Sequence, residues 1–173
     1  MAETLAGGDR RSTGKSREVA DLVKRQPELA ADLFNLMVDH ESPVVRARAG
    51  HAFKTVAREK PEVVQPFTGE LLKRAAVMEQ WEIREAVCHT MPHLILSQKE
   101  VQRFFLVFSG YLDDRRSFVR TFAMQGLVDL VKLDRRLAPR VVPILMTLSL
   151  TGSAAMRARG RKLKKELEKM GLI

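Results

Sequence analysis

Four short segments of the chain share one pattern, and their spacing constrains the fold more than any other feature. Each opens with an aliphatic residue followed by arginine and has a small or aliphatic residue four places after the first. The segments begin at Val45, Ile83, Val119 and Met156, which lie 38, 36 and 37 residues apart. Self-similarity at a period of about 20 to 50 residues is typical of folds that stack one structural unit repeatedly. We therefore expect a stack of about four similar units.

The apolar residues of the first segment indicate that each unit contains a helix. Val45, Ala49, Ala52, Phe53 and Val56 follow the spacing i, i+4, i+7, i+8, i+11, which places them on one face of an α-helix. A second amphipathic segment precedes each such helix, at residues 28–39, 61–78, 99–112 and 139–150. The chain is therefore predicted to form four helix pairs.

Residues at the helix ends support these boundaries. Ser42 stands directly before a proline, as an N-cap does before a first-turn proline, and Ser97 and Glu100 have the spacing of a capping box. Gly171 is placed to end the last helix. Pro66 and Pro143 fall inside the first helices of their pairs, where proline removes a hydrogen bond of the ladder, so we expect both helices to kink there.

These features together resemble HEAT repeats. The resemblance lies in a helix pair every 36 to 38 residues, in a proline within the first helix, and in an acid ahead of the aliphatic residue and arginine that open the second, as in residues 113–120. It covers roughly residues 27–170 and departs from the family pattern before Met156, where no acid stands. The resemblance implies an all-α, right-handed α-solenoid of the armadillo-like kind with about four HEAT-like helix pairs.

The N-terminal residues fall outside the repeats. Residues 16–26 have Val19, Leu22 and Val23 on one side, so we expect an N-terminal capping helix there. Residues 1–15 are polar and contain three glycines, and they are predicted to form a flexible basic arm. The predicted domain organisation is therefore an arm at 1–15 and a HEAT-like repeat domain at 16–173.

The charge favours an acidic partner. The chain has 30 Lys and Arg against 21 Asp and Glu, which gives a formal net charge of +9. Residues 157–169 alone hold seven Lys or Arg against two Glu. A field of this sign attracts nucleic acid, anionic membrane surfaces or acidic protein segments.

The resemblance also implies where a partner would bind, because the second helices of HEAT solenoids line a concave surface. Aligning the repeats assigns nine residues to this face: His51, Lys54, Arg58, His89, Gln125, Lys132, Lys162, Lys165 and Lys169. The middle of the same columns holds Pro92, Leu96 and Val128, which indicates a less polar centre. We predict a scaffold or adaptor that holds an acidic segment of a partner protein in this groove. The alternative is a nucleic-acid-binding module that contacts the phosphate backbone through the basic residues.

A second set of repeat-equivalent residues is interpreted as structural. It consists of Arg46, Arg84, Arg120 and Arg157. Arginines at this position of a helix repeat usually bind turn acids or neighbouring helix ends.

Enzymatic alternatives have weaker support in the sequence. His89, His93 and Glu85 share a helical face near His51, as a metal site would require. Asp129 lies where HEAT-like DNA glycosylases that remove alkylated bases carry a catalytic acid, but no aromatic pocket accompanies it. Residues 9–16 miss the first glycine of a phosphate-binding loop. The predictions are therefore no enzyme, no catalytic residue, no metal and no cofactor.

The remaining features concern the cellular compartment. Cys88 is the only cysteine, so no disulfide can form within the chain. No apolar run reaches the length of a membrane span. We expect a cytoplasmic protein, and the sequence leaves its oligomeric state open.

Overall fold

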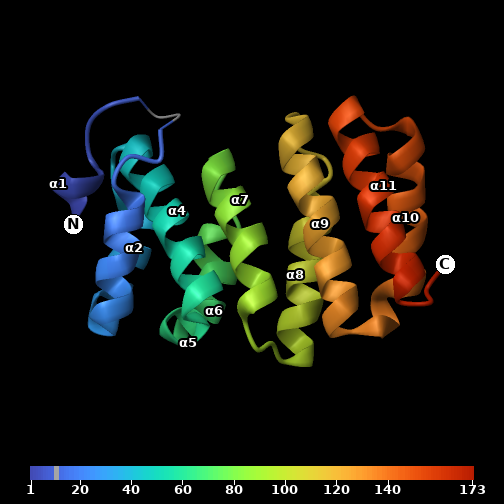
Figure 1. Cartoon of the computed structure of the whole chain (residues 1–173), viewed down its shortest axis with the longest axis horizontal. Helices are drawn as coiled ribbons and strands as arrows, with labels where there is room; N and C mark the ends of the chain where they lie inside the picture. Colours follow the sequence, from blue (N-terminus) through green and yellow to red (C-terminus); the bar gives the residue numbers. More distant parts are fainter. Residues whose placement is uncertain (10–11) are drawn as a thin grey trace. The chain divides into compact units, whose positions relative to one another are not determined.

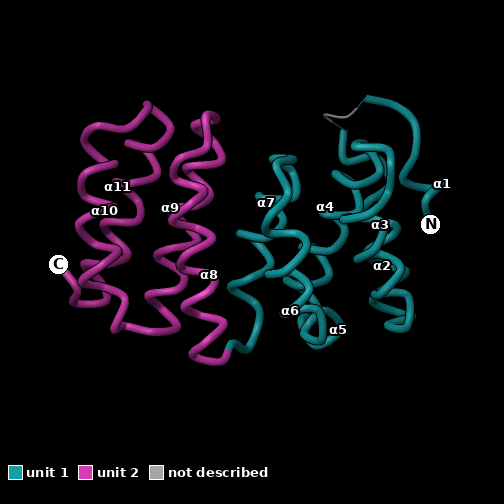
Figure 2. The backbone as a smooth tube through the Cα atoms, turned by 180° about the vertical axis from the view of Figure 1, so that it is seen from behind, with its two compact units in different colours: residues 1–96 teal, residues 97–173 magenta. Residues whose placement is uncertain are grey.

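The computed structural model of the chain describes residues 1–9 and 12–173 and is all-α, with 80% of residues in helices. No strand occurs in those two ranges. The chain divides into two compact units, Met1–Leu96 and Ser97–Ile173 (Figure 2). Along the same residues, no helix combines the length and the hydropathy that crossing a membrane would require. The single repeat domain at 16–173 stays a prediction.

Unit 1 contains seven α-helices among its described residues: α1 (Ala2–Leu5), α2 (Ser16–Arg25), α3 (Ala30–Asp39), α4 (Pro43–Glu59), α5 (Pro61–Val64), α6 (Thr68–Glu70) and α7 (Trp81–Thr90). Helix α4 packs on α3 and lies between α2 and α7 (Figure 1). The centre of the unit is aromatic. The ring of Phe34 lies 5.6 Å from that of Phe53 and 5.4 Å from that of Phe67, centroid to centroid. Apolar burial on one face of α4 thus holds the neighbouring helices together.

Proline controls two features of unit 1. The predicted interruption at Pro66 is confirmed, because α5 gives way there to the 3₁₀ turn η2 (Gln65–Phe67), followed by α6 and the π-helical turn η3 (Leu71–Ala75). Pro92 has an effect that the sequence analysis missed. It ends α7 at Thr90, and the 3₁₀ turn η4 (Met91–His93) leads into an extended Leu94. The second helix of this pair is therefore shorter than predicted.

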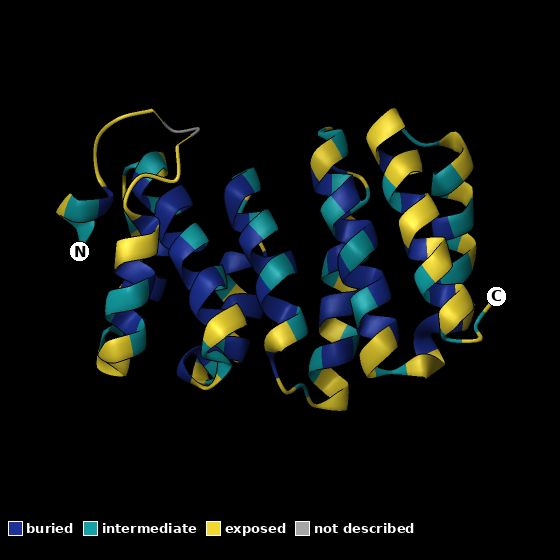
Figure 3. Cartoon of the chain, in the orientation of Figure 1, coloured by how far each residue is buried: buried dark blue, intermediate teal, exposed yellow. Residues whose placement is uncertain are grey.

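Unit 2 contains four longer helices: α8 (Gln98–Tyr111), α9 (Ser117–Leu133), α10 (Ala138–Thr151) and α11 (Ala154–Lys169). Helix α9 packs on α8 and on α11, and α11 packs on α10. Two glycines let helices approach closely. A Cβ on Gly126 would lie 2.7 Å from the ring of Phe108, and a Cβ on Gly160 would overlap Ser149. Figure 3 shows that buried residues gather where the helices of each unit face one another.

The predicted helix ends of unit 2 are confirmed. The Ser97 side chain accepts a hydrogen bond from the backbone N–H of Glu100, and the Glu100 side chain accepts one from the backbone N–H of Ser97. Gly171 has a φ of +68°, the left-handed conformation that commonly ends a helix. Pro143, unlike Pro66, does not interrupt its helix: α10 continues through it as one α-helix.

The N-terminal segment differs from the flexible arm that the sequence predicts. Leu5 is completely buried, and α1 packs on α2 and α4. The guanidinium of Arg48, on α4, donates hydrogen bonds to backbone carbonyls of this segment. The physical reason is that a buried guanidinium needs several acceptors, and the N-terminal backbone supplies them. Arg10 and Arg11, which contribute charge to the predicted arm, lie outside the described residues.

Candidate functional site

Three exposed residues of the predicted binding face, Lys162, Lys165 and Lys169, form a stripe on α11. The spacing i, i+3, i+7 places the three lysines on one side of the helix over about 10 Å, opposite the buried Met156 and Leu163. Across the described residues, none of the three makes a hydrogen bond or an ion pair. We call this set the lysine stripe. Its ammonium groups are available to an anionic ligand.

A polar network connects α11 to α9. It includes Gln125 and Lys132, the two residues of α9 that were predicted to belong to the binding face. Lys132 Nζ lies 2.7 Å from Asp129 Oδ1 and 2.8 Å from Glu166 Oε2. Gln125 donates to Asp129 Oδ1 at 3.1 Å and accepts from Arg159 Nη1 at 2.8 Å. Burial of the ammonium opposes its charge, but the hydrogen bonds with Asp129 and Glu166 outweigh it and raise the pKa of Lys132. Lys132 and Gln125 therefore hold α9 against α11.

Two residues of unit 1 that were predicted for the binding face, Lys54 and His89, lie close to a carboxylate of the protein itself. Lys54 Nζ lies 2.6 Å from Glu85 Oε1, and this ion pair joins α4 to α7. His89 Nδ1 is 3.9 Å from the same carboxylate oxygen. The side chain of Lys54 is only 16% exposed. A ligand would have to break a partly buried ion pair to reach it.

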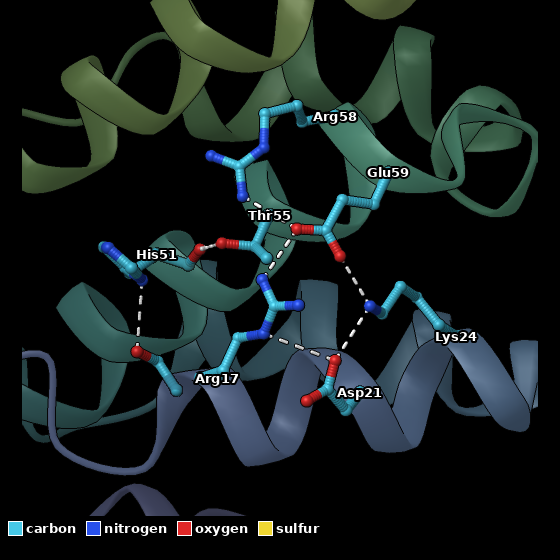
Figure 4. A network of polar contacts seen from close by, with 8 residues as sticks. Arg17, Asp21, Lys24, His51, Thr55, Arg58 and Glu59 are labelled. Atoms are coloured by element: carbon cyan, nitrogen blue, oxygen red, sulfur yellow. Dashed lines mark hydrogen bonds and ion pairs between the residues drawn. The ribbon is translucent and has the colours of Figure 1, made fainter.

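Arg58 belongs to a network around Glu59 that is drawn in Figure 4. Glu59 accepts from Lys24 Nζ at 2.5 Å, from Arg58 Nη2 at 2.8 Å and from Arg17 Nη1 at 2.6 Å. Asp21 lies 2.8 Å from Lys24 Nζ and completes the set. The hydrogen bond from Lys24, followed by those from Arg58 and Arg17, lowers the pKa of Glu59 to about 2. The two carboxylates offset most of the charge of the three cations, and the network joins α2 to α4.

His51 lies beside this network. Its Nδ1 is 3.1 Å from the Oγ of Ser16, which is completely buried. Burial, followed by the nearby charge of Lys54, lowers the pKa of His51. A ring whose pKa is lowered favours its neutral form and so adds little positive charge to the predicted face.

The less polar centre of the predicted groove is not formed as expected. Val128 is fully buried in α9, because the column that contains it turns toward the core of unit 2. Pro92 and Leu96 lie beyond the end of α7, so they do not continue its helical face. The prediction that Val128 offers an apolar contact to a ligand is therefore wrong, because its side chain is buried.

Three of the four repeat-equivalent arginines bind carbonyls of the turn before their own helix. Arg46 Nη1 donates to His40 at 2.7 Å, Arg84 Nε to Met78 at 2.9 Å, and Arg157 Nη1 to Gly152 at 2.6 Å, always at the backbone oxygen. Arg120 differs, since its Nε is buried without a hydrogen-bond partner among the described residues. These contacts fasten each turn to the helix that follows it.

The candidate catalytic and metal-ligating residues do not gather into a site. His93 lies in the turn η4 and not in α7, the helix that carries Glu85 and His89. Asp129 is engaged by Gln125 and Lys132. Over residues 1–9 and 12–173, no group of three His, Cys, Asp or Glu residues is arranged to hold a metal ion.

The carboxylates that pair with the basic columns were not predicted from the sequence. Glu59, Glu85 and Glu166 each pair with a cation on a neighbouring helix. The Arg17–Glu59 pair spans 42 residues of sequence and the Lys54–Glu85 pair spans 31. The sequence signal was an acid close to the basic column in the same or the next repeat. Only the lateral register of the helices decides which acid meets which base.

No family model, no curated protein and no solved structure matches the chain.

Proposed function

We propose that the chain is a HEAT-like scaffold that binds an acidic segment of a partner protein through the lysine stripe on α11. The observation that carries this proposal is a difference in charge pairing. Of the nine residues predicted for the binding face, only Lys162, Lys165 and Lys169 lack a hydrogen bond or ion pair among the described residues. Unpaired lysines close together repel one another, and an anionic partner relieves that repulsion.

The solenoid is part of the proposal and has local support in each unit. In unit 1, α4 and α7 pack side by side, and in unit 2, α9 and α11 do so. These are the second helices of the predicted pairs, and they share the repeat spacing of 36 to 38 residues. In a right-handed solenoid of four HEAT-like pairs these helices line the concave surface, and the lysine stripe lies at its C-terminal end.

The surroundings of the stripe favour an acidic protein segment over a nucleic acid. Asp129 and Glu166 lie beside it on α9 and α11, where they engage Lys132. Phosphates follow one another along a nucleic acid backbone, so carboxylates at the edge of the contact would repel them. A peptide can place its acids against the lysines and its backbone N–H groups against these carboxylates. An acidic segment is therefore the ligand that this mixed surface fits best.

A titration with two labelled probes tests the proposal. The probes are a Glu-rich peptide and a DNA duplex, and fluorescence anisotropy is measured at low and at near-physiological salt. The test variant combines Lys162→Ala, Lys165→Ala and Lys169→Ala. The control variant combines Arg25→Ala, Lys73→Ala and Lys99→Ala, which removes the same charge from exposed residues elsewhere.

We expect the peptide to bind the wild-type chain and the control variant, and to lose at least about tenfold in affinity in the test variant. A tenfold loss corresponds to about 1.4 kcal/mol of binding free energy, or about 0.5 kcal/mol for each lysine, which is typical of an exposed charge pair. Equal losses in both variants would show that net charge alone attracts the peptide. Tighter binding of the duplex near physiological salt, lost in the test variant, would replace the proposal with the nucleic-acid alternative.

A further inference from the structure

Helix α9 has one line of side chains that reach the surface of unit 2. At the spacing i, i+4, i+7, i+11, i+14, the line consists of Phe118, Phe122, Gln125, Asp129 and Lys132. The rings of Phe118 and Phe122 lie edge to face, with centroids 6.3 Å apart. Phe118 is 39% exposed and is the only exposed aromatic side chain among the described residues. The line is therefore aromatic at the start of α9 and polar along the rest of the helix.

The line of α11 that contains the lysine stripe begins with two small residues. At alternating steps of three and four residues, this line consists of Ala155, Ala158, Lys162, Lys165 and Lys169. Such steps keep all five residues on one side of a helix, and both alanines are exposed. This side of α11 is therefore apolar with short side chains near its N-terminus and cationic over its C-terminal half.

Two contacts show how α9 and α11 lie against each other. Arg159 Nη1 donates to Gln125 Oε1 at 2.8 Å, and Lys132 Nζ lies 2.8 Å from Glu166 Oε2. Both pairs join residues 34 apart in sequence. The two helices therefore run side by side in the same direction (Figure 1).

This register brings the aromatic residues of α9 beside the alanines of α11. An offset of 34 residues places Phe122 level with residue 156 and Phe118 level with residue 152. Ala155 is thus at the height of the aromatic pair, and Ala158 lies one turn before Lys162. We call Phe118, Phe122, Ala155 and Ala158 the aromatic patch. It is continuous with the lysine stripe along α11.

We propose that the aromatic patch binds a large apolar side chain of the same acidic segment that the lysine stripe binds, an inference that rests on the function proposed above. The lysines define most of the ligand as anionic by charge complementarity. Covering an exposed phenyl ring is favourable only for an apolar group. Because patch and stripe share one side of α11, a single short segment covers both. The patch supplies the apolar contact that the sequence predicted at Val128.

The rise of α11 sets the spacing of groups within the ligand. Ala155 and Lys162 are seven residues apart, as are Lys162 and Lys169, and seven residues of helix span about 10 Å. An extended peptide covers that distance with about three residues. The ligand is therefore a segment with an apolar residue at one end and with acids about three and six residues away from it.

Paired peptides test this inference by fluorescence anisotropy. One labelled peptide has a leucine three residues from the first of its glutamates, and its partner has serine in place of the leucine. A second pair has the sequences reversed, because the patch and the stripe set the order of the groups and not the direction of the peptide. All four peptides are titrated with the wild-type chain and with the variant in which Lys162, Lys165 and Lys169 are replaced by alanine.

Three further variants of the full chain locate the apolar contact. Phe118→Ala removes the exposed ring, and Ala155→Gln puts a polar side chain on the patch without removing a buried group. Leu106→Ala is the matched control, since it removes a side chain that is 65% exposed from α8. Circular dichroism establishes that each variant is folded.

We expect one leucine peptide to bind the wild-type chain and the Leu106→Ala variant at least about fivefold more tightly than its serine partner. Fivefold is about 1 kcal/mol, part of what full burial of a leucine side chain contributes. Phe118→Ala and Ala155→Gln should each abolish this preference and leave the affinity for the serine peptide unchanged. The triple lysine variant should weaken the binding of both peptides.

The possible failures are distinguishable. Equal affinities of the leucine and serine peptides in both pairs, with binding lost in the triple lysine variant, would overturn the inference and leave the proposed function intact. A preference for leucine that persists in both patch variants would also overturn it, since the apolar contact would lie elsewhere. Absence of binding by all four peptides would reject the proposed function, and the inference with it.

Discussion

The cationic columns of unit 1 and of α11 occupy equivalent positions in the repeat but differ in how their charges are satisfied. Lys54 and Arg58 reach Glu85 and Glu59, and these contacts fasten α4 to α7 or belong to a network with α2. Lys162, Lys165 and Lys169 extend into solvent. The comparison teaches that a basic column read from a sequence has two outcomes, a structural contact or a binding surface. Whether a carboxylate lies within reach, on the same helix or on a neighbouring one, decides between them.

Among the cations of the two regions, the largest effect on stability is expected at Arg48, a buried cation of unit 1. Arg48→Ala removes the donors for five carbonyls and should lower the free energy of unfolding by about 3 kcal/mol. Urea denaturation followed by circular dichroism measures it. Arg103→Ala, at an exposed position of α8, is the matched control. A loss no larger than that of the control would mean that the N-terminal carbonyls find other partners.

A smaller effect is expected where one lysine of unit 1 is removed. Lys54→Ala leaves the carboxylate of Glu85, which is 21% exposed, without its principal cation. We expect a loss of about 1 kcal/mol in the free energy of unfolding. The double variant Lys54→Ala/Glu85→Ala should recover part of that loss in the same urea experiment. Purely additive effects would show that the ion pair contributes nothing.

The network around Glu59 predicts a pH dependence. The pKa of Glu59 in the folded protein is lowered from its ordinary 4.5 to about 2. Its contribution to stability is therefore complete above about pH 4.5 and is lost as the pH falls from there toward 2. Glu59→Gln should flatten the stability profile in that window, measured as thermal midpoint against pH. Glu28→Gln, at an exposed position, should leave the profile unchanged.

The smallest effect on stability is expected in the lysine stripe. Lys165→Ala should change the free energy of unfolding by no more than about 0.5 kcal/mol, because no described residue pairs with it. Relief of repulsion from Lys162 and Lys169 makes slight stabilisation the expected sign. A loss as large as that of Lys54→Ala would remove the contrast between the two regions, and with it the reason for proposing the stripe as a binding surface.

Local features of the fold could be predicted because they depend on residues close in sequence. The capping box of Ser97 and Glu100, the interruption at Pro66 and the glycine end at Gly171 each follow from the conformational preferences of a few neighbouring residues. The early end of α7 had the same kind of signal in Pro92, but the repeat alignment, which carried the helix on to Leu96, concealed it. A repeat pattern can outweigh a single proline when both are read together.

The candidate site was predictable only in part, for reasons of packing. The exposure of Lys162, Lys165 and Lys169 follows from helical periodicity. The burial of Val128 does not, because it depends on how α9 is rotated against the rest of unit 2. The Arg48 contacts were also out of reach, since the acceptors lie 36 to 43 residues away in a segment without a repeat.

The sequence by itself determined that the chain is helical, where most of its helices begin and end, and which positions recur from repeat to repeat. Hydrophobic periodicity and capping are local, so they can be read without knowing what each helix touches. The tertiary structure decided which charges are neutralised, which column is exposed, and that Leu5 and Arg48 fasten the N-terminal segment. These outcomes depend on the lateral register of helices 30 or more residues apart, and burial and ion pairing act at distances of a few ångströms once that register is set.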